Sequence, residues 1–246
     1  MSAQTAASRP DPLWTRPEAR AVLGETLRPG DFALTDRAVE ALDLRPGMSA
    51  LDAGCGTGAT VRRLRRRFGL HALGIDLCPA PPAANSLALA PGLASGLVQS
   101  RIDALPLRNH CLDAVFCECV LSLQMDPKGV LAEFHRVLAP GGGLALSDLY
   151  RPDPTSPGEK RTDFPATEPP PSCAQGALPR ARLLALLTKA GFRVSRFEDH
   201  TPLLRELAAR LAWAGCATPC CGPGCGVEPV PGYFLLIATK PENDHA

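Results

Sequence analysis

One stretch of ten residues decides the fold, and it reads Ser49-Ala-Leu-Asp-Ala-Gly-Cys-Gly-Thr-Gly58. An apolar run that ends in an acid and then enters a glycine-rich turn predicts a buried strand followed at once by a helix. Val61, Leu64 and Phe68 recur at helical spacing directly after this turn, and Gly69 supplies a stop. The stretch therefore predicts a strand, a tight turn and a helix whose N-terminus faces the turn.

Outward from this unit, the same alternation of strand and helix continues along the chain. Asp126 is expected as the N-cap of one helix, with Pro127 at its first position. This rhythm predicts an α/β fold with a parallel sheet and helices on both faces. Further strands are expected at 72–76, 97–102, 112–116, 144–147, 192–197 and 233–239, and helices at 85–90, 127–138, 181–190 and 203–213.

Length and composition restrict the class of protein. The 246 residues are 45% hydrophobic and carry a formal net charge of +1. This content supports one sizeable core, which excludes a disordered chain and a miniprotein that depends on disulfides. The sequence contains no apolar run near the roughly 20 residues of a membrane span, and it has no broad basic footprint for nucleic acid. We therefore expect a soluble, cytoplasmic protein without a nucleic-acid or membrane partner.

The 26 prolines and 10 cysteines are unusual, and their positions divide the chain. We expect an N-terminal extension, partly flexible, at 1–26, one domain at 27–240 and a tail at 241–246. Within the domain, 151–179 is a proline-rich loop of the length that usually covers an active site, and 214–231 is a cysteine-rich insertion.

The glycine turn has a spacing that indicates its ligand. Gly54-x-Gly56-x-Gly58 differs from the dinucleotide pattern G-x-G-x-x-G, and Asp52 precedes it on the strand. A carboxylate there would repel a pyrophosphate, but it suits a ligand that bears an ammonium and a sulfonium group. Asp76 ends the second strand, where a ribose diol needs an acceptor.

With these motifs, the sequence resembles the class I S-adenosylmethionine-dependent methyltransferases. Leu51 to Gly58 looks like their first motif, Gly74-Ile-Asp76 like the acid of the second strand, and Arg136 to Gly142 like the turn before the fifth strand. The resemblance implies a Rossmann-like, doubly wound sheet of seven strands, six parallel and one antiparallel, and a cover for the cofactor around residues 31–34. It implies S-adenosylmethionine as methyl donor, held by Asp52, Gly54, Cys55, Gly56, Gly58, Asp76, Leu77, Ile102, Asp103 and Glu118.

Three further segments resemble the arsenite methyltransferase branch of this family. They are Ile102-Asp-Ala-Leu-Pro106, Glu118-Cys-Val-Leu-Ser-Leu123 and Cys173-Ala-Gln-Gly-Ala-Leu178. The likeness implies adenine contacts from Ile102 and Asp103. It also implies that Cys119 and Cys173 hold trivalent arsenic as thiolates, aligned with the methyl group without a metal ion.

Other readings stay open because the chain departs from that branch. Glu118 and Ser122 replace two asparagines, and no cysteine precedes Cys55. If the acceptor is another small molecule, Glu118 can act as an acid or base, or it can be a solvated or helix-capping residue. The spacing of Cys216, Cys220, Cys221 and Cys225 does not match the common zinc pattern, so these are at most soft-ion ligands.

The sequence thus supports three hypotheses. The first is a methyltransferase that acts on a small and possibly thiophilic molecule. The second is an arsenite methyltransferase that uses Cys119 and Cys173. The third is a cysteine-rich metal or metalloid binding protein that keeps the fold but does not catalyse.

Overall fold

The sheet has the topology expected from the sequence. The computed structural model describes residues 17–78, 96–152, 172–216 and 230–242. Its strands follow the order β3-β2-β1-β4-β5-β8-β7, and β8 runs antiparallel between two strands that are parallel to the rest. The bounds are β1 Ser49–Ala53, β2 His71–Asp76, β3 Leu97–Gln99, β4 Leu112–Glu118, β5 Leu138–Arg151, β7 Arg193–Asp199 and β8 Gly232–Thr239. The prediction of six parallel strands and one antiparallel strand is confirmed.

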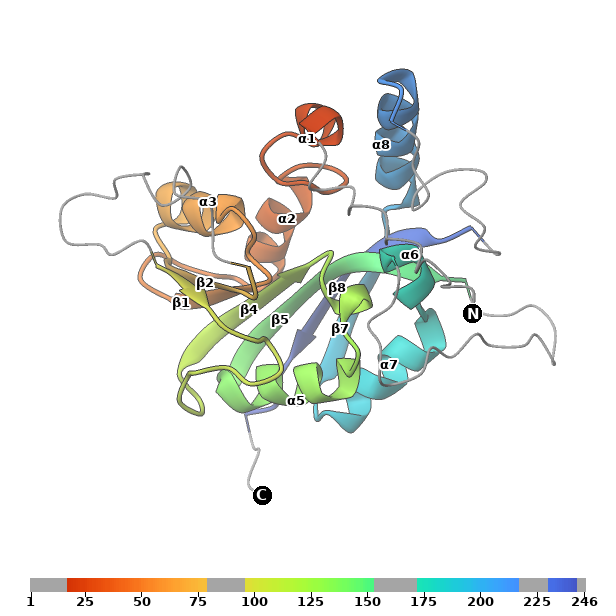
Figure 1. The fold of residues 1–246 in the computed structure, drawn as a ribbon. Coiled ribbons are helices and arrows are strands. Elements are labelled where there is room, and N and C mark those ends of the chain that lie inside the picture. The colour runs from red at the N-terminus through yellow and green to blue at the C-terminus, as the bar shows by residue number, and fades with distance from the viewer. Residues whose placement is uncertain (1–16, 79–95, 153–171, 217–229, 243–246) are drawn as a thin grey trace, which may run out of the picture.

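Helices cover both faces of this sheet (Figure 1). Alternate residues of a strand point to opposite faces, so the neighbours Val115 and Phe116 of β4 belong to different halves of the core. Phe134 of α5 and Leu187 of α7 pack in the half that contains Val115. On the other face, α2 and α3 pack in the half that contains Phe116. The bounds are α2 Ala33–Ala41, α3 Ala59–Phe68, α5 Pro127–Val137 and α7 Arg180–Lys189.

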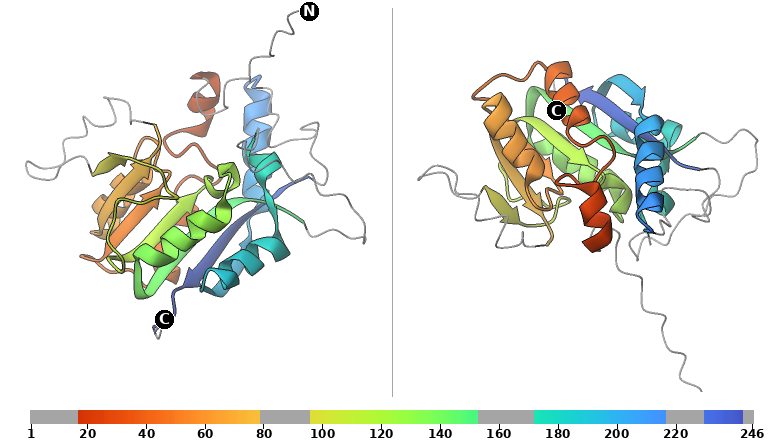
Figure 2. Two further views of the ribbon diagram at one scale, coloured as in Figure 1. Left: turned by 60° about the horizontal axis from the view of Figure 1, so that its bottom comes forward. Right: turned by 90° about the horizontal axis from the view of Figure 1, so that it is seen from above.

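Two further helices lie at the edge of the sheet where the parallel strands end. They are α1, Pro17–Leu23, and α8, Thr201–Trp213, and they pack against each other. Figures 1 and 2 show both helices rising from this edge beyond the main layers. Leu23, Leu207 and Leu211 form part of a small hydrophobic cluster that is separate from the main core. We refer to α1 and α8 as the cap.

The structure differs from the expectation in several elements. β5 begins at Leu138, because residues 138–143 pair with β4 across an irregularity instead of forming a free turn. β3 ends at Gln99, three residues early. Asp126 occupies the N-cap position, but its side chain makes no capping hydrogen bond.

The expected loop at 151–179 and the expected extension at 1–26 both contain regular structure. Residues Cys173–Gly176 form helix α6, with Ser172 as its N-cap, and Leu178–Pro179 form a short strand, β6, beside β5. Helix α1 lies within the extension. Residues 153–171 and the segment 85–90 lie outside the described residues, so neither the expected cover nor the expected weak helix is tested. None of the helices in the described ranges is long and apolar enough to cross a membrane.

Candidate functional site

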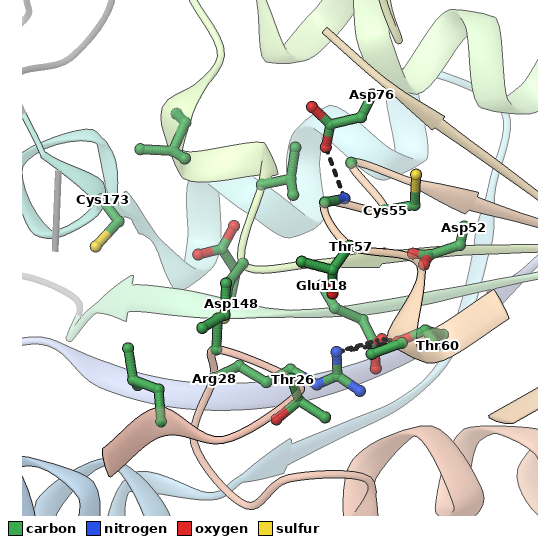
Figure 3. A pocket seen from close by; sticks show the side chains of 18 of the residues that line it. Thr26, Arg28, Asp52, Cys55, Thr57, Thr60, Asp76, Glu118, Asp148 and Cys173 are labelled. Atoms are coloured by element: carbon green, nitrogen blue, oxygen red, sulfur yellow. Dashed lines mark hydrogen bonds and ion pairs between the residues drawn. The ribbon is translucent and has the colours of Figure 1, made fainter. Parts of the chain in front are cut away.

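A cavity of about 340 Å³ lies where β1, β2, β4 and β5 end. This volume is within the usual range of small-molecule sites, and the carboxyl edge of an open parallel sheet is where such folds bind ligands. In the view of Figure 3, Asp52, Cys55 and Asp76 lie on one side of the cavity, and Asp148 and Cys173 lie on the other. We refer to these as the cofactor end and the acceptor end.

The glycine turn forms the wall of the cofactor end. Gly54 has φ +85°, and a Cβ at this position would lie 2.3 Å from Cγ2 of Val120. Only glycine fits, because a side chain would be strained by the backbone conformation and would also collide with Val120. Gly58 does not line the cavity; it is the N-cap of α3, with φ +76°.

Asp76 is held at the cofactor end by backbone groups. One carboxylate oxygen accepts a hydrogen bond from the N–H of Gly56 at 2.8 Å, and the other accepts one from the N–H of Cys78 at 2.9 Å. A carboxylate offers about four lone-pair positions, so each oxygen can still accept a bond from a ligand hydroxyl. The neighbouring Leu77 also lines the cavity.

Asp52 lies at the bottom of the same end and is 3% exposed. No described residue donates a hydrogen bond to its carboxylate. Burial, together with the nearby Glu118 carboxylate, raises the pKa of Asp52 to about 8, although Arg28 acts in the opposite direction. A buried carboxylate in this position favours a cationic ligand group, because a positive charge would restore the ionised form.

Glu118 is neither solvated nor a helix cap. Its carboxylate forms an ion pair with Arg28 at 3.0 Å between side chains that are both 6% exposed. It also accepts hydrogen bonds from the hydroxyls of Thr35 at 2.8 Å and Thr60 at 2.9 Å. Arg28 in turn donates to both threonines. Its pKa is raised, because the attraction of Glu118 and other nearby groups outweighs the effect of burial. With these partners, Glu118 is a positioning residue that ties the N-terminal segment to β4.

Cys119 follows Glu118 and ends the strand geometry. It has φ +59°, which is uncommon for a residue other than glycine. Its side chain packs with the half of the core opposite to that of Cys117, so the two thiols do not share a face. The Cys119 sulfur lies 3.2 Å from the hydroxyl of Tyr233, which also lines the cavity. Burial raises the pKa of the Cys119 thiol well above its ordinary value, which keeps the group neutral.

Cys173 reaches the same cavity from α6. This helix packs on the short helix Leu121–Leu123 that follows Cys119. The structure thus brings to one cavity the two cysteines that sequence reasoning paired. Neither is in a disulfide.

The acceptor end contains an acid that the sequence analysis did not single out. Asp148 is 2% exposed, and its carboxylate accepts hydrogen bonds from the backbone N–H and the hydroxyl of Ser122 and from the N–H of Leu149. Burial raises the pKa of Asp148 to about 6, against the effect of these donors. The sequence does contain a pattern that marks Asp148 as a candidate, because this acid follows an apolar run toward the end of a strand, just as Asp52 and Asp76 do.

Two polar residues of the N-terminal segment were also missed. Arg28 lines the cavity, as does Thr26, whose hydroxyl is buried and has no hydrogen-bond partner among the described residues. Their contacts depend on the folding of the segment back over the sheet, so no local pattern marked them.

Not every predicted site residue lines the cavity. Ile102 does, beside Ser100, whereas Asp103 does not, because both of its carboxylate oxygens are bound by Arg101. The cover from the N-terminal segment also differs, since residues 25–29 line the cavity in place of residues 31–34. The predicted residues that line it are Asp52, Gly54, Cys55, Gly56, Asp76, Leu77, Ile102, Glu118, Cys119 and Cys173.

The cysteine-rich insertion remains largely untested. Cys216 packs against the cap cluster, and Cys220, Cys221 and Cys225 lie outside the described residues. Within the ranges that the structure describes, no group of three or more His, Cys, Asp or Glu residues could hold a metal ion.

Comparison with known proteins agrees with this geometry. Residues 51–146, from β1 into β5, match the family described as methyltransferase domain. This match supports the class I S-adenosylmethionine-dependent methyltransferase family that the sequence resembles.

Curated relatives of this chain differ in what their names say they act on. Phosphoethanolamine N-methyltransferase 1 of Zea mays is 28% identical over 141 residues, 55% of this chain and 26% of that protein. Arsenite methyltransferase of Halobacterium salinarum is 28% identical over 153 residues, 61% of this chain and 38% of that protein. This chain therefore spans well under half the length of these relatives.

Solved structures share the fold over most of the methyltransferase. The cyclase SpnF superposes with a TM-score of 0.66 at 25% identity and covers 93% of each chain. Phosphoethanolamine N-methyltransferase 2 of Haemonchus contortus, solved with S-adenosyl-L-methionine, gives 0.64 at 16% identity, over 90% of this chain and 56% of that one. At that identity the second likeness concerns the fold alone.

Proposed function

We propose that this chain transfers a methyl group from S-adenosylmethionine to a small-molecule acceptor. The observation that carries the proposal is the single cavity, which joins a cofactor end made of strand-end acids and a glycine turn to an acceptor end with different chemistry. A donor and an acceptor bound at the two ends would meet inside one enclosed space.

The residues of the cofactor end fit S-adenosylmethionine. Asp76 has acceptor positions left for a ribose diol, and the buried Asp52 has no cation at hydrogen-bond distance in the described structure. The bound donor would supply an electrophilic methyl group. Ile102 and Leu77 offer apolar contacts to an adenine ring.

At the acceptor end, the protein contributes position and exclusion of water. Tyr233 and Asp148 are almost fully buried, Cys119 is half-buried, and the three come from neighbouring strands at this edge of the sheet. A reacting atom held there, in line with the methyl group, would gain rate from alignment alone. Asp148 stands close enough to the cavity to receive the proton that an acceptor loses.

The test is release of S-adenosylhomocysteine with a panel of arsenite plus excess thiol, thiols, quinols and phenols. Calorimetry measures binding of the same product. We expect Asp76→Ala to weaken binding by about 30- to 100-fold, since charged hydrogen bonds contribute about 1.5–3 kcal/mol each. Asp103→Ala is the matched control and should change binding less than twofold, because that carboxylate is bound to Arg101. A wild-type protein that binds neither donor nor product would contradict the proposal.

A second candidate is methyl transfer to trivalent arsenic. It is supported by the placement of Cys119 and Cys173 at one cavity and by the arsenite methyltransferase relative. Cys119→Ser and Cys173→Ser should each abolish arsenic-dependent turnover. Cys111→Ser is the control, because that thiol donates to the carbonyl of Arg108, away from the cavity. Undiminished turnover in both cavity variants would sink this candidate.

A third candidate, the non-catalytic metal or metalloid binding protein, rests on the cysteine-rich insertion. It predicts stoichiometric metal or metalloid in the purified protein and no turnover with the panel. Elemental analysis of the full chain separates it from both catalytic candidates.

A further inference from the structure

The wall of the acceptor end is made largely of leucines. Leu23 and Leu27 come from α1 and the segment after it, and Leu204 and Leu207 come from α8. Leu123 and Leu149 add to them from the sheet side. Leu23, Leu204 and Leu207 belong to the cap, and Leu27 follows α1; all four lie outside the residues that match the family. The apolar wall is thus formed largely by segments outside the matched domain.

The charges on the cavity wall are strongly one-sided. Five carboxylates line it, whereas Arg28 is the one basic side chain among the described lining residues. Arg28 is occupied by Glu118, Thr35, Thr60 and the carbonyl of Asp31. The five acids are Glu25, Asp52, Asp76, Glu118 and Asp148.

This arrangement disfavours an anionic ligand at the acceptor end. Phosphate and carboxylate groups are bound in proteins by guanidinium or ammonium groups, or at helix N-termini. Here a phosphate would lie beside the buried Asp148 carboxylate and would find no unengaged cation on the described wall. Uncharged polar groups also line the cavity, namely the hydroxyls of Thr26 and Tyr233 and the thiol of Cys119, and only the Thr26 hydroxyl among these three has no hydrogen-bond partner in the described residues.

We propose that the methyl acceptor is an apolar molecule without a negative charge, bound against the leucines of the cap with its reacting group beside Cys119 and Tyr233. The proposal rests on the proposed function and names the substrate class of that site. It separates this chain from relatives and structural neighbours whose names contain phosphoethanolamine or geranyl diphosphate.

The test compares two matched pairs of probes, 1-naphthol with 1-naphthyl phosphate and geraniol with geranyl phosphate. Calorimetry is done on the full chain saturated with S-adenosylhomocysteine. We expect the alcohol of each pair to bind at least tenfold more tightly than its phosphate. Equal or tighter binding of the phosphates, or no binding of either alcohol, would overturn the proposal.

Variants of α8 test the role of the cap. Leu207→Ala should weaken binding of the alcohols about tenfold and leave the affinity for S-adenosylhomocysteine within twofold of wild type. Leu211→Ala is the matched control, because Leu211 is also buried on α8 but does not line the cavity. If both variants weaken alcohol binding equally, the effect comes from loss of the helix and the proposal is wrong.

A variant designed to gain phosphate binding tests the role of charge at the apolar wall. Leu207→Arg would place a cation at the apolar wall, and we expect it to improve binding of the phosphates relative to the alcohols by at least tenfold. An unchanged ratio would count against a role of charge. Failure of wild type to bind S-adenosylhomocysteine would defeat the proposed function itself, whereas normal binding with a preference for phosphates would defeat this inference alone.

Discussion

The two ends of the cavity are built from different materials. At the cofactor end, ligand contacts come from the ends of β1 and β2 and from the backbone of the glycine turn. At the acceptor end, the lining groups come from leucines of α1 and α8, from residues that follow β4 and from Asp148 and Leu149 near the end of β5. The first set is fixed by the register of neighbouring parallel strands, while much of the second depends on helices packed at the edge of the sheet.

This difference separates what the fold imposes from what the individual chain adds. Paired strands leave little freedom to Asp52 and Asp76, because β1 and β2 pair residue by residue from Ser49 and His71 onward. The cap has its own small cluster, so its side chains can vary without disturbing the sheet. Specificity for the acceptor is therefore expected to reside in the cap, and donor binding in the sheet.

The largest expected effect concerns Arg28, which pairs with Glu118 and so ties the N-terminal segment to β4. Arg28→Ala would leave Glu118 buried without its cation, and we expect a loss of about 3–5 kcal/mol in the free energy of unfolding. Denaturant unfolding measures it. Arg37→Ala is the control, because the Arg37 side chain is 46% exposed in its pair with Glu198 and should cost less than about 1 kcal/mol.

The double variant Arg28→Ala with Glu118→Ala tests whether the unpaired Glu118 carboxylate causes the loss of stability in Arg28→Ala. It should be more stable than Arg28→Ala alone, because no unpaired carboxylate remains. If the double variant is the less stable of the two, the N-terminal segment is held by other contacts, and the two ends are less connected than the structure indicates.

The next effect distinguishes the two functions of glycine within the turn. Gly54→Ala combines a strained backbone with a Cβ 2.3 Å from Val120, so we expect a loss of about 3 kcal/mol or more. Gly56→Ala has φ +49° but no atom within 4 Å of the new Cβ, so about 1 kcal/mol is expected. Thermal unfolding of both variants provides the measurement. Equal losses would mean that close packing against Val120 contributes nothing.

A further effect is a pH dependence at the cofactor end. In the folded protein Asp52 keeps its proton up to about pH 8, whereas in the unfolded chain it ionises near pH 4. The folded state therefore binds more protons in this window, and the contribution of Asp52 to stability falls as pH rises through it. Asp52→Asn should remove that fall.

Donor binding should show the opposite trend. A cation near Asp52 favours the ionised carboxylate, so binding of S-adenosylmethionine releases a proton below about pH 8. Affinity should then rise with pH between 6 and 8 by up to about tenfold per pH unit. Calorimetry in buffers of different ionisation enthalpy measures the proton. A release that persists unchanged in Asp52→Asn would assign it to another group.

Sequence reasoning reached the parts of the molecule that local patterns determine. Apolar runs that end in Asp52 and Asp76 marked two strands and the cofactor end, and glycine at 58 and 69 marked both ends of α3. The same reasoning did not foresee that Asp103 lies outside the cavity with its carboxylate bound by Arg101 two residues away. It also left Glu118 open between an acid or base and a solvated or helix-capping residue, since its burial with Arg28, 90 positions distant, has no local pattern.

The cap could not have been predicted from its own residues. The periodic leucines of α8 indicated a helix, but Leu204 and Leu207 look the same as core residues until α1 is placed beside them. Tyr233 became part of the site only through the strand order, because it lies at the start of β8, whereas Asp52, Asp76 and Asp148 lie toward the ends of their strands.

The direction of β8 has a consequence for how such a protein can change. A strand that runs against its neighbours starts at the edge where they finish, so the start of β8, with Tyr233, lies beside the cavity. An insertion before Gly232 therefore enters the chain at the edge of the sheet that carries the cavity. The eight residues of β8 that pair with β5, Gly232–Thr239, keep their register. Replacement of α8 by a different segment would therefore change the acceptor end of the cavity and leave the residues of the cofactor end in place.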